Sequence, residues 1–432
     1  MEFKERKHGF GLSDIAFRLS GKKAVVETEV IHGKRLNIIF TFFNKANYER
    51  ELRDWLDFQK KRLWQRESGQ KVEGFKILEG MKKKPRISYG EFIKTAVPFF
   101  SRIIFEAFSD NPSFFGNMDE TIIQIKVERA ERWEYDRASK EYSFEGAFPY
   151  STPDYFVHKA MQSGLLDLDH YFIAFSGFYI LQAIVAPYVY LHRIDYNFFY
   201  KYLTHEIEHY HSYAMGYYHP EFELEKSLGP HMAASSDYTL LSLQKCLSDL
   251  RNEGFADFRK KRFTTRIQVV PRIIRNFRNL VRRIPQIRKK QGVSDFYEKE
   301  IYAGSMEGVY YCGYIMAFFI TYSLDPRFSK IVFNNGSEAG LEQLSKAFDT
   351  EKEFYITPPS PKAYDEAMNI INNSDAVAFL KRYEEACARL GLNPDSMVLT
   401  MSLFKQLWNE AEYIFEKEEL AKIRKEHYYP AF

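Results

Sequence analysis

The feature that most constrains the fold of this 432-residue chain is the stretch 196–214, which contains neither proline nor glycine. It predicts one uninterrupted helix, and Asn197 near its start is a residue type that commonly caps helices. Apolar side chains recur at steps of three and four residues, and they form a stripe that would be buried against a core: Phe199, Leu203, Ile207, Tyr210 and Ala214. The rest of the fold must supply a core for this stripe.

A second face of the same helix carries two histidines one turn apart. His205 and His209 stand at positions i and i+4, so both imidazoles can point at one metal ion. Glu206 follows the first histidine, where it can hold a metal-bound water. Phe198 and Tyr202 share the histidine face, so that face is not purely polar. The alternative is a polar helix face on which the histidines are coincidental.

A third ligand is needed, because catalytic zinc usually takes three protein ligands and a water. The best candidate lies in segment 251–258, which reads RNEGFADF. Asp237 is expected to cap the helix leading into it, and its apolar face is Leu240, Leu243, Leu247 and Leu250. Glu253 and Asp257 lie one turn apart, so Glu253 can bind the metal while Asp257 accepts a hydrogen bond from a ligand imidazole. An exposed acidic helix face is the alternative.

Together the two elements resemble those of the gluzincins, the thermolysin-like clan of zinc peptidases. That family combines HExxH with a downstream Asn-Glu-x-x-x-Asp or Glu-x-x-x-Asp helix, and residues 252–257 here read NEGFAD. The resemblance implies zinc as the cofactor, held by three ligands: His205, His209 and Glu253. It implies Glu206 as the general base and Asp257 as the residue that orients a ligand. The resemblance covers the two helices and little else.

Other zinc-binding patterns fit less well. A metzincin needs glycine three residues and histidine six residues after the second ligand, and Ser212 and Met215 stand there. His211 points to a different side of the helix from His209. His219 and His231, in loop-like sequence, are reserve ligands.

The expected activity is hydrolysis of peptide bonds in a peptide or protein substrate. Zinc lowers the pKa of its bound water and polarises a carbonyl, while Glu206 takes the proton and passes it to the leaving amine. The oxyanion needs a second electrophile, which gluzincins usually supply from a later helix as Tyr or His. Segment 307–322 offers Tyr310, Tyr311 and Tyr314, and we assign the catalytic role to Tyr310 and Tyr314. Because the chain has 30 tyrosines, ordinary aromatic packing is the alternative for each.

The composition bounds the class of protein and its compartment. A hydrophobic share of 45% with 28% charged residues is typical of a soluble globular protein, and a net charge of +3 gives no global argument for nucleic acid. Cys246, Cys312 and Cys387 are few and widely spaced, so they predict neither a disulfide framework nor a cysteine zinc site. The first residues have no signal-peptide core behind them. We therefore expect a cytoplasmic protein.

The pattern of elements predicts an α+β fold with a zincin-like catalytic core, in which a mixed β-sheet carries the active-site helix. We expect three regions: an α+β region over 1–115, the catalytic core over 116–330 and a mostly helical region over 331–432. Strands are predicted within 15–43, with Gly21 and His32-Gly33 as turns. Helices are predicted over 45–66 and 90–109, the second kinked or divided at Pro98, and a hairpin over 121–148.

The stretch 171–191 contains no charged residue and is long enough to cross a bilayer. Ser176, Gly177 and Pro187 interrupt it, so we favour a buried core segment and keep a membrane association as the minor alternative. Residues 186–190 could form an edge strand that offers its backbone to an extended peptide.

A basic segment follows the second helix, because Lys and Arg recur between Asp257 and Asp295 without any acidic residue. Within 271–290 the apolar residues follow helical spacing and five arginines occupy other faces, namely Arg272, Arg275, Arg278, Arg282 and Arg283. Pro285 is expected to bend or end this helix. It could meet an anionic membrane surface, nucleic acid, an acidic partner or an acidic substrate, or it could pack on the domain with a solvated basic face.

Two other functions therefore compete with a plain peptidase. One is a binding protein on a zincin scaffold that uses the basic helix, and the other is a protease that acts on proteins bound to nucleic acid. The intact Glu206 favours an enzyme, since a purely structural zinc site would not need it.

Overall fold

The structure is a computed structural model that describes residues 24–64, 88–115, 119–128, 132–136, 141–145, 150–151, 173–176, 181, 196–214, 238–260, 267–287, 296–302, 308–325, 331–340, 343–357, 359–411 and 413. The chain divides into two compact units, Met1–Ala214 and Met215–Phe432. Each has a hydrophobic core of its own and mixes helices with strands, so the predicted α+β class is confirmed. The zincin-like core and the boundaries after 115 and 330 stay predictions.

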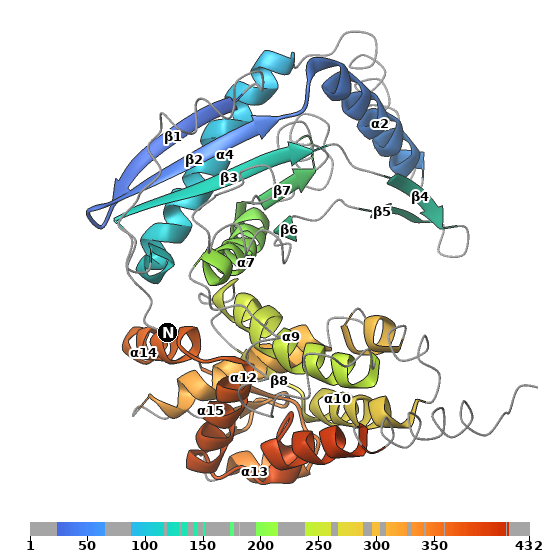
Figure 1. Cartoon of the computed structure of the whole chain (residues 1–432), viewed down its shortest axis with the longest axis vertical. Helices are drawn as coiled ribbons and strands as arrows, with labels where there is room; N and C mark the ends of the chain where they lie inside the picture. Colours follow the sequence, from blue (N-terminus) through green and yellow to red (C-terminus); the bar gives the residue numbers. More distant parts are fainter. Residues whose placement is uncertain are drawn as a thin grey trace, which may run out of the picture. The chain divides into compact units, whose positions relative to one another are not determined.

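The first unit is built on a five-stranded mixed sheet in the order β1-β2-β3-β7-β6 (Figure 1). Its strands are β1 (Ala24–Ile31), β2 (Lys34–Phe42), β3 (Glu120–Glu128), β7 (Ile173–Ser176) and β6 (Tyr150–Ser151). The inner strands β2, β3 and β7 are parallel, and the edge strands β1 and β6 are antiparallel to their neighbours. The predicted turn between β1 and β2 is confirmed, because His32 and Gly33 both have the positive φ that a two-residue hairpin turn requires. Gly21 lies outside the described residues.

Residues 121–148 do not form the single hairpin that the sequence predicts. β3 joins the central sheet, while the hairpin lies further along, between β4 (Arg132–Asp136) and β5 (Glu141–Glu145). The alternation was a true strand signal, since Ile123, Ile125 and Val127 are buried. Gln124 on the opposite face is also buried, because a central parallel strand is covered on both faces. An alternating pattern cannot reveal which strand is the partner.

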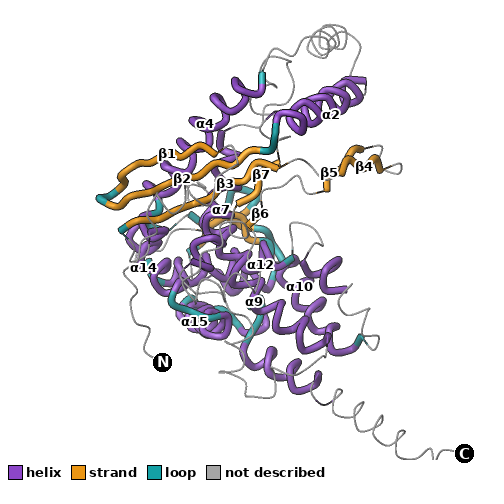
Figure 2. Tube along the Cα trace, turned by 45° about the horizontal axis from the view of Figure 1, so that its top comes forward, coloured by secondary structure: helices purple, strands orange, loops and turns teal. Residues whose placement is uncertain are grey.

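Helices α2 (Lys45–Trp64), α4 (Tyr89–Asp110) and α7 (Tyr196–Ala214), with the short helix η1 (Pro112–Phe115), complete the described part of this unit. α4 lies across the strands of the sheet (Figure 2). It begins at a capping box, in which Glu91 N–H donates to the Ser88 side chain and Ser88 N–H donates to Glu91. The predicted division at Pro98 does not occur, because one helix runs through this exposed proline.

The second unit is mostly helical, as predicted for the part beyond 330. Its described helices are α9 (Tyr238–Lys260), α10 (Pro271–Arg283), α12 (Val309–Ser323), α13 (Leu344–Asp349), α14 (Pro361–Asn372) and α15 (Ala376–Arg389), and residues 401–411 are also helical. Short helical turns are η4 (Ile284–Gln286), η5 (Tyr297–Tyr302) and η7 (Pro394–Ser396). A small antiparallel sheet has the order β10-β9-β11-β8, with strands β8 (Ile267–Val269), β9 (Ile331–Phe333), β10 (Glu338–Ala339) and β11 (Phe354–Ile356). α12 is the central helix, because every residue from Cys312 to Tyr322 is buried.

No helix among the described residues is long and apolar enough to cross a membrane. Within 171–191 the structure describes β7 and Leu181, which is fully buried. The edge strand predicted over 186–190 lies outside the described residues.

Candidate metal centre

In the first unit, aromatic packing and two hydrogen bonds fix helix α7 against α4. The rings of Phe99 and Phe100 each lie 5.5 Å from the ring of Phe199, edge to face. Tyr200 donates a hydrogen bond of 2.7 Å to Asp110, and Tyr196 donates to Glu106. The predicted apolar stripe is confirmed where it is described, since Phe199, Leu203 and Ile207 are all buried. These contacts fix the rotation of α7 about its axis and so determine which residues lie on its other face.

On that other face the two histidines meet at their Nε2 atoms. The distance from His205 Nε2 to His209 Nε2 is 3.1 Å, and the rings are edge to face at 85°. Two imidazole nitrogens bound tetrahedrally to one zinc ion at about 2.0–2.1 Å lie about 3.3 Å apart. The observed spacing of 3.1 Å is close to this value. The pair is therefore pre-arranged for a shared ion.

The first histidine of the pair and two carboxylates near it on α7 are buried. His205 is 6% exposed, Glu206 is 7% exposed and Glu208 is 1% exposed. His211 lies on a different side, where its ring packs edge-on against Phe114 at 5.8 Å. As predicted, His211 does not belong to the histidine pair.

In the second unit, α9 carries three carboxylates at successive turns, Asp249, Glu253 and Asp257. Asp249 accepts a hydrogen bond of 2.6 Å from Tyr297, and Glu253 Oε1 accepts one of 3.2 Å from Tyr302. Asp249 and Asp257 are buried and Glu253 is partly buried, so this is not the exposed acidic face that the sequence left open. Asp237, the expected cap, lies outside the described residues.

His205, His209 and Glu253 offer ligand atoms that all lie within 4.8 Å of one another, so this group could hold a metal ion. It is the one such group of His, Cys, Asp or Glu side chains in the part of the chain that the structure describes. Two imidazoles and a carboxylate form the donor set of one common class of catalytic zinc site. His219 and His231 lie outside the described residues, and the hydrogen bond from a ligand imidazole to Asp257 stays a prediction.

The three candidate tyrosines of α12 have different surroundings. Tyr310 donates to the hydroxyl of Tyr302 at 3.1 Å, which connects it to Glu253. Tyr311 accepts from Val270 N–H at 2.8 Å, so it supports the start of α10. Tyr314 is 4% exposed and its ring lies 6.0 Å from that of Phe258.

Burial raises the pKa of Tyr314 and of Tyr310 well above the ordinary phenol value. Nearby carboxylates act in the same direction, Asp257 on the pKa of Tyr314 and Glu253 on that of Tyr310. Both phenols therefore stay protonated and can donate hydrogen bonds. The assignment of Tyr310 and Tyr314 to the oxyanion stays a prediction.

Sequence reasoning missed Tyr302, Tyr297 and Asp249. Asp249 had a detectable signal, because it stands one turn before Glu253. Tyr302 and Tyr297 had none, since they bracket the π-helical turn η5, whose side chains do not follow the spacing of an α-helix.

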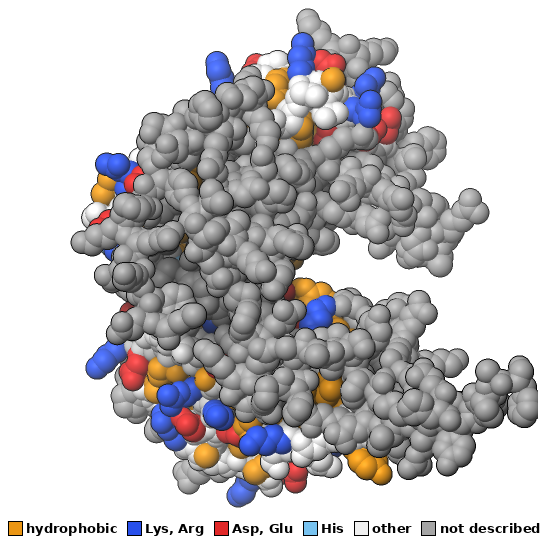
Figure 3. Space-filling view, viewed as in Figure 1, with side chains coloured by type: hydrophobic (Ala, Val, Ile, Leu, Met, Phe, Trp, Pro, Cys, Tyr) orange, Lys and Arg blue, Asp and Glu red, His pale blue; other side chains and the backbone are white. Residues whose placement is uncertain are grey.

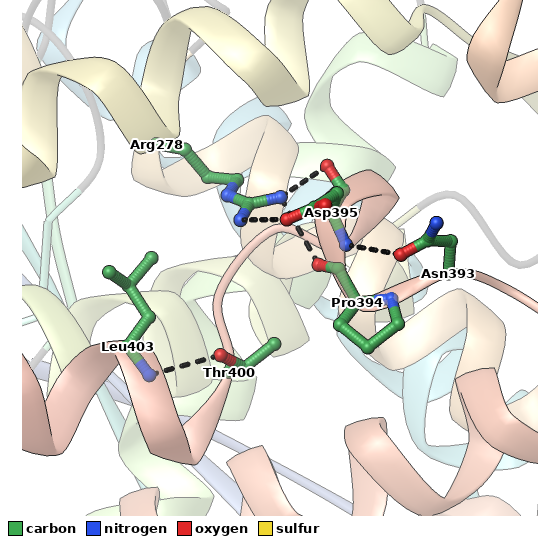
Figure 4. A network of polar contacts seen from close by, with 6 residues as sticks. All are labelled: Arg278, Asn393, Pro394, Asp395, Thr400 and Leu403. Atoms are coloured by element: carbon green, nitrogen blue, oxygen red, sulfur yellow. Dashed lines mark hydrogen bonds and ion pairs between the residues drawn. The ribbon is translucent and has the colours of Figure 1, made fainter.

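The predicted basic helix exists as α10, and it ends before Pro285, as expected. Its apolar residues Ile273, Ile274, Phe277 and Val281 are buried, and the last three belong to the core of the second unit. Arg278 is buried as well: it donates to the carbonyl oxygens of Pro394 and Asp395 and pairs with the Asp395 carboxylate at 3.7 Å (Figure 4). Arg275 pairs with Glu351 at 2.6 Å.

Comparison with protein-family models, curated proteins and solved structures found no match for this chain. The resemblance to gluzincins therefore rests on the residues of two helices, and what the site does must be argued from those residues.

Proposed function

We propose that this protein is a zinc-dependent peptidase of the gluzincin type, with His205, His209 and Glu253 as ligands. One observation carries the proposal: the two Nε2 atoms on α7 lie 3.1 Å apart beside Glu206. Zinc bound there would supply a Lewis acid for the scissile carbonyl and activate the attacking water. A structural site would have no use for a buried carboxylate next to the first ligand.

The side chains have separate tasks in this reaction. Glu206 takes a proton from the attacking water and later passes it to the leaving amine. Asp257 orients a ligand imidazole, and a protonated tyrosine of α12 donates to the developing oxyanion. The substrate is a peptide or protein. A reducing, cytoplasmic setting is part of the proposal, supported by three buried cysteine thiols.

The test compares hydrolysis with metal content. Wild-type protein is expected to cleave a mixture of quenched fluorescent peptides, to lose activity on treatment with a zinc chelator, and to regain it when zinc is returned. Glu206→Gln keeps the size of the side chain and removes the base, so it should keep zinc and lose at least about 100-fold in rate. Glu208→Gln, the same change two residues along α7, is the matched control. Hydrolysis by Glu206→Gln at the wild-type rate would rule out this base.

A second candidate function is binding of nucleic acid by the outer face of α10, alone or joined to the protease. Arg272, Arg275, Arg282 and Arg283 are exposed on this face with Asn276 and Asn279. The apolar face is buried in the unit, so insertion into a membrane is disfavoured. On the face that Figure 3 shows, the coloured Lys and Arg side chains of the second unit stand among Asp and Glu. A phosphate backbone would therefore meet this helix rather than a broadly basic surface.

The test of this candidate uses the arginines that are exposed. Wild type should bind a labelled DNA oligomer at low salt, with affinity falling steeply as salt rises. Arg272→Gln with Arg282→Gln should lower the salt slope by about two, roughly one for each phosphate that no longer meets an arginine. Arg382→Gln with Lys381→Gln on α15 removes the same charge elsewhere and should change little. Absence of DNA binding by wild type at low salt would dismiss the candidate, and binding to anionic vesicles alone would favour a membrane surface.

A further inference from the structure

We propose that Tyr302 is a positioning residue for the metal ligand Glu253, with Tyr310 holding Tyr302 in place. The inference rests on the proposed function for the identity of the ligand. It assigns a role to a residue outside both helices that resemble those of gluzincins. The Tyr302 hydroxyl holds one carboxylate oxygen of Glu253 by a hydrogen bond, so that Glu253 would bind the metal through its other oxygen.

The hydrogen bonds run in one direction. Tyr310 donates to the Tyr302 hydroxyl at 3.1 Å, and Tyr302 donates to Glu253 Oε1 at 3.2 Å. A phenol has a single proton, so a Tyr302 hydroxyl that donates to Glu253 can only accept in its second hydrogen bond, and the donor there must be another group. Tyr310 is that group. All three side chains are partly buried, where such bonds are stronger than in water.

Close backbone approaches hold the three elements that carry these side chains. A β-carbon at Gly308, which precedes the first turn of α12, would lie 2.1 Å from the carbonyl oxygen of Ile301 at the end of η5. Glycine at 308 therefore lets the turn that carries Tyr310 sit directly on the turn that carries Tyr302. α12 in turn packs on α9, which carries Glu253. The relative positions of the three side chains are thus set by backbone.

The Tyr302 ring also lies beside a cation. The Lys245 ammonium lies 5.0 Å from the centroid of the Tyr302 ring and 5.1 Å from that of Tyr297. Tyr297 is itself held by its 2.6 Å hydrogen bond to Asp249. With a cation over the ring and a phenol on its hydroxyl, Tyr302 has little freedom to turn away from Glu253.

The consequence for a metal is a matter of carboxylate geometry. A carboxylate with no fixed donor can rotate and offer both oxygens, whereas a hydrogen bond on one oxygen favours binding through the other. Outer groups of this kind typically change metal affinity by about 10- to 100-fold. A tyrosine that served only to fill space would not change metal affinity when its hydroxyl alone is removed.

The experiment measures zinc affinity of the full chain by competition with a chromophoric chelator. Tyr302→Phe is expected to weaken zinc binding by about 10- to 100-fold. Tyr311→Phe is the matched control, because it removes a phenol hydrogen bond, the one accepted from Val270 N–H, without touching Glu253 or Tyr302. It should keep the wild-type affinity. Tyr310→Phe should weaken binding less, and adding it to Tyr302→Phe should cost nothing further, since the two act through one hydrogen bond.

A second readout is the visible spectrum of the cobalt-substituted protein, which reports coordination number. Tyr302→Phe is expected to show weaker absorption bands, as a carboxylate that binds through both oxygens raises that number. Wild-type zinc affinity and an unchanged cobalt spectrum in Tyr302→Phe would overturn the inference. Glu253→Ala separates the two claims. If it binds zinc like wild type, the proposed ligand set fails, whereas if it loses zinc while Tyr302→Phe does not, only the positioning role fails.

Discussion

Gly254 of α9 and Gly313 of α12 touch backbone to backbone where the two helices cross. A β-carbon built on Gly254 would lie 2.2 Å from the Cα of Gly313, and one built on Gly313 would lie 2.0 Å from the carbonyl oxygen of Leu250. Real β-carbons do not approach this closely, so both positions need glycine. Gly254 directly follows Glu253. The crossing therefore determines where the candidate ligand Glu253 lies along α12 relative to the tyrosines of that helix.

Gly254→Ala should therefore destabilise the second unit, although alanine is the better helix former. We expect a loss of about 3 kcal/mol or more, at or above the upper end of the usual range for overpacking, because the clash is with backbone rather than with a side chain that can move. Urea unfolding followed by circular dichroism measures the change, and zinc affinity should fall with it.

Gly90→Ala is the matched control for this substitution. Gly90 lies in the first turn of α4, where an added β-carbon would meet no atom closer than 4.0 Å. There the same change should stabilise the protein by about 0.5–1 kcal/mol, because alanine loses less backbone entropy. Equal urea midpoints for the two variants would show that α9 and α12 do not cross as closely as described.

Asp257→Asn should weaken zinc retention without removing a ligand. The substitution keeps the shape of the side chain and removes the charge that we propose orients a ligand imidazole, and such a loss typically costs about 10- to 100-fold in affinity. Competition with a chelator at fixed pH measures the dissociation constant. Asp365→Asn on α14, an exposed acid, serves as the control. An unchanged dissociation constant in Asp257→Asn would leave this acid with a packing role only.

The cysteines should make stability depend on pH on the alkaline side. Burial raises the pKa of Cys387 to about 12, and it raises the pKa of Cys246 further still. The folded state then holds these protons more tightly than the unfolded chain, whose thiols titrate at about 8.5. Their contribution is complete below that pH and is lost as pH rises towards 12.

Two measurements check this expectation. The free energy of unfolding should fall as pH rises above about 8.5, and the fall should be smaller in Cys387→Ala. Iodoacetamide at pH 8 should label the cysteines only after urea is added, since the neutral buried thiol is unreactive. Rapid labelling of the native protein at pH 8 would contradict the burial of these thiols.

The sequence predicted those parts of the fold and site that depend on local spacing. The helix that carries His205 and its apolar stripe follow from the spacing of apolar residues, and the His32-Gly33 turn follows from residues that tolerate a positive φ. The structure confirms the helix, the turn and the described part of the stripe. The helix through Pro98 was predicted to be kinked or divided; it is not divided, because the proline faces solvent and packing on the sheet stabilises the helix around it, and the kink stays a prediction. The hairpin over 121–148 was wrong because the partner of a strand is a long-range property.

The tyrosines around Glu253 show a second limit of the sequence. Tyr302 reaches Glu253 from a π-helical turn, and Tyr310 reaches Tyr302 because Gly308 allows a close backbone approach. No regular spacing of residues in the sequence predicts either interaction. The arginines of α10 were placed on one helix correctly, but burial of Arg278 against η7 depends on a segment more than a hundred residues away.

The zinc content of the purified protein tests the central claim most directly. Elemental analysis should find about one zinc ion per chain in wild type, since three protein ligands hold a single catalytic zinc. His205→Ala, His209→Ala and Glu253→Ala should each lose most of it. His32→Ala and Glu300→Ala, exposed residues of the same types, should keep the wild-type content. Wild type without zinc after growth in zinc-supplemented medium, or full zinc occupancy in Glu253→Ala, would contradict the account.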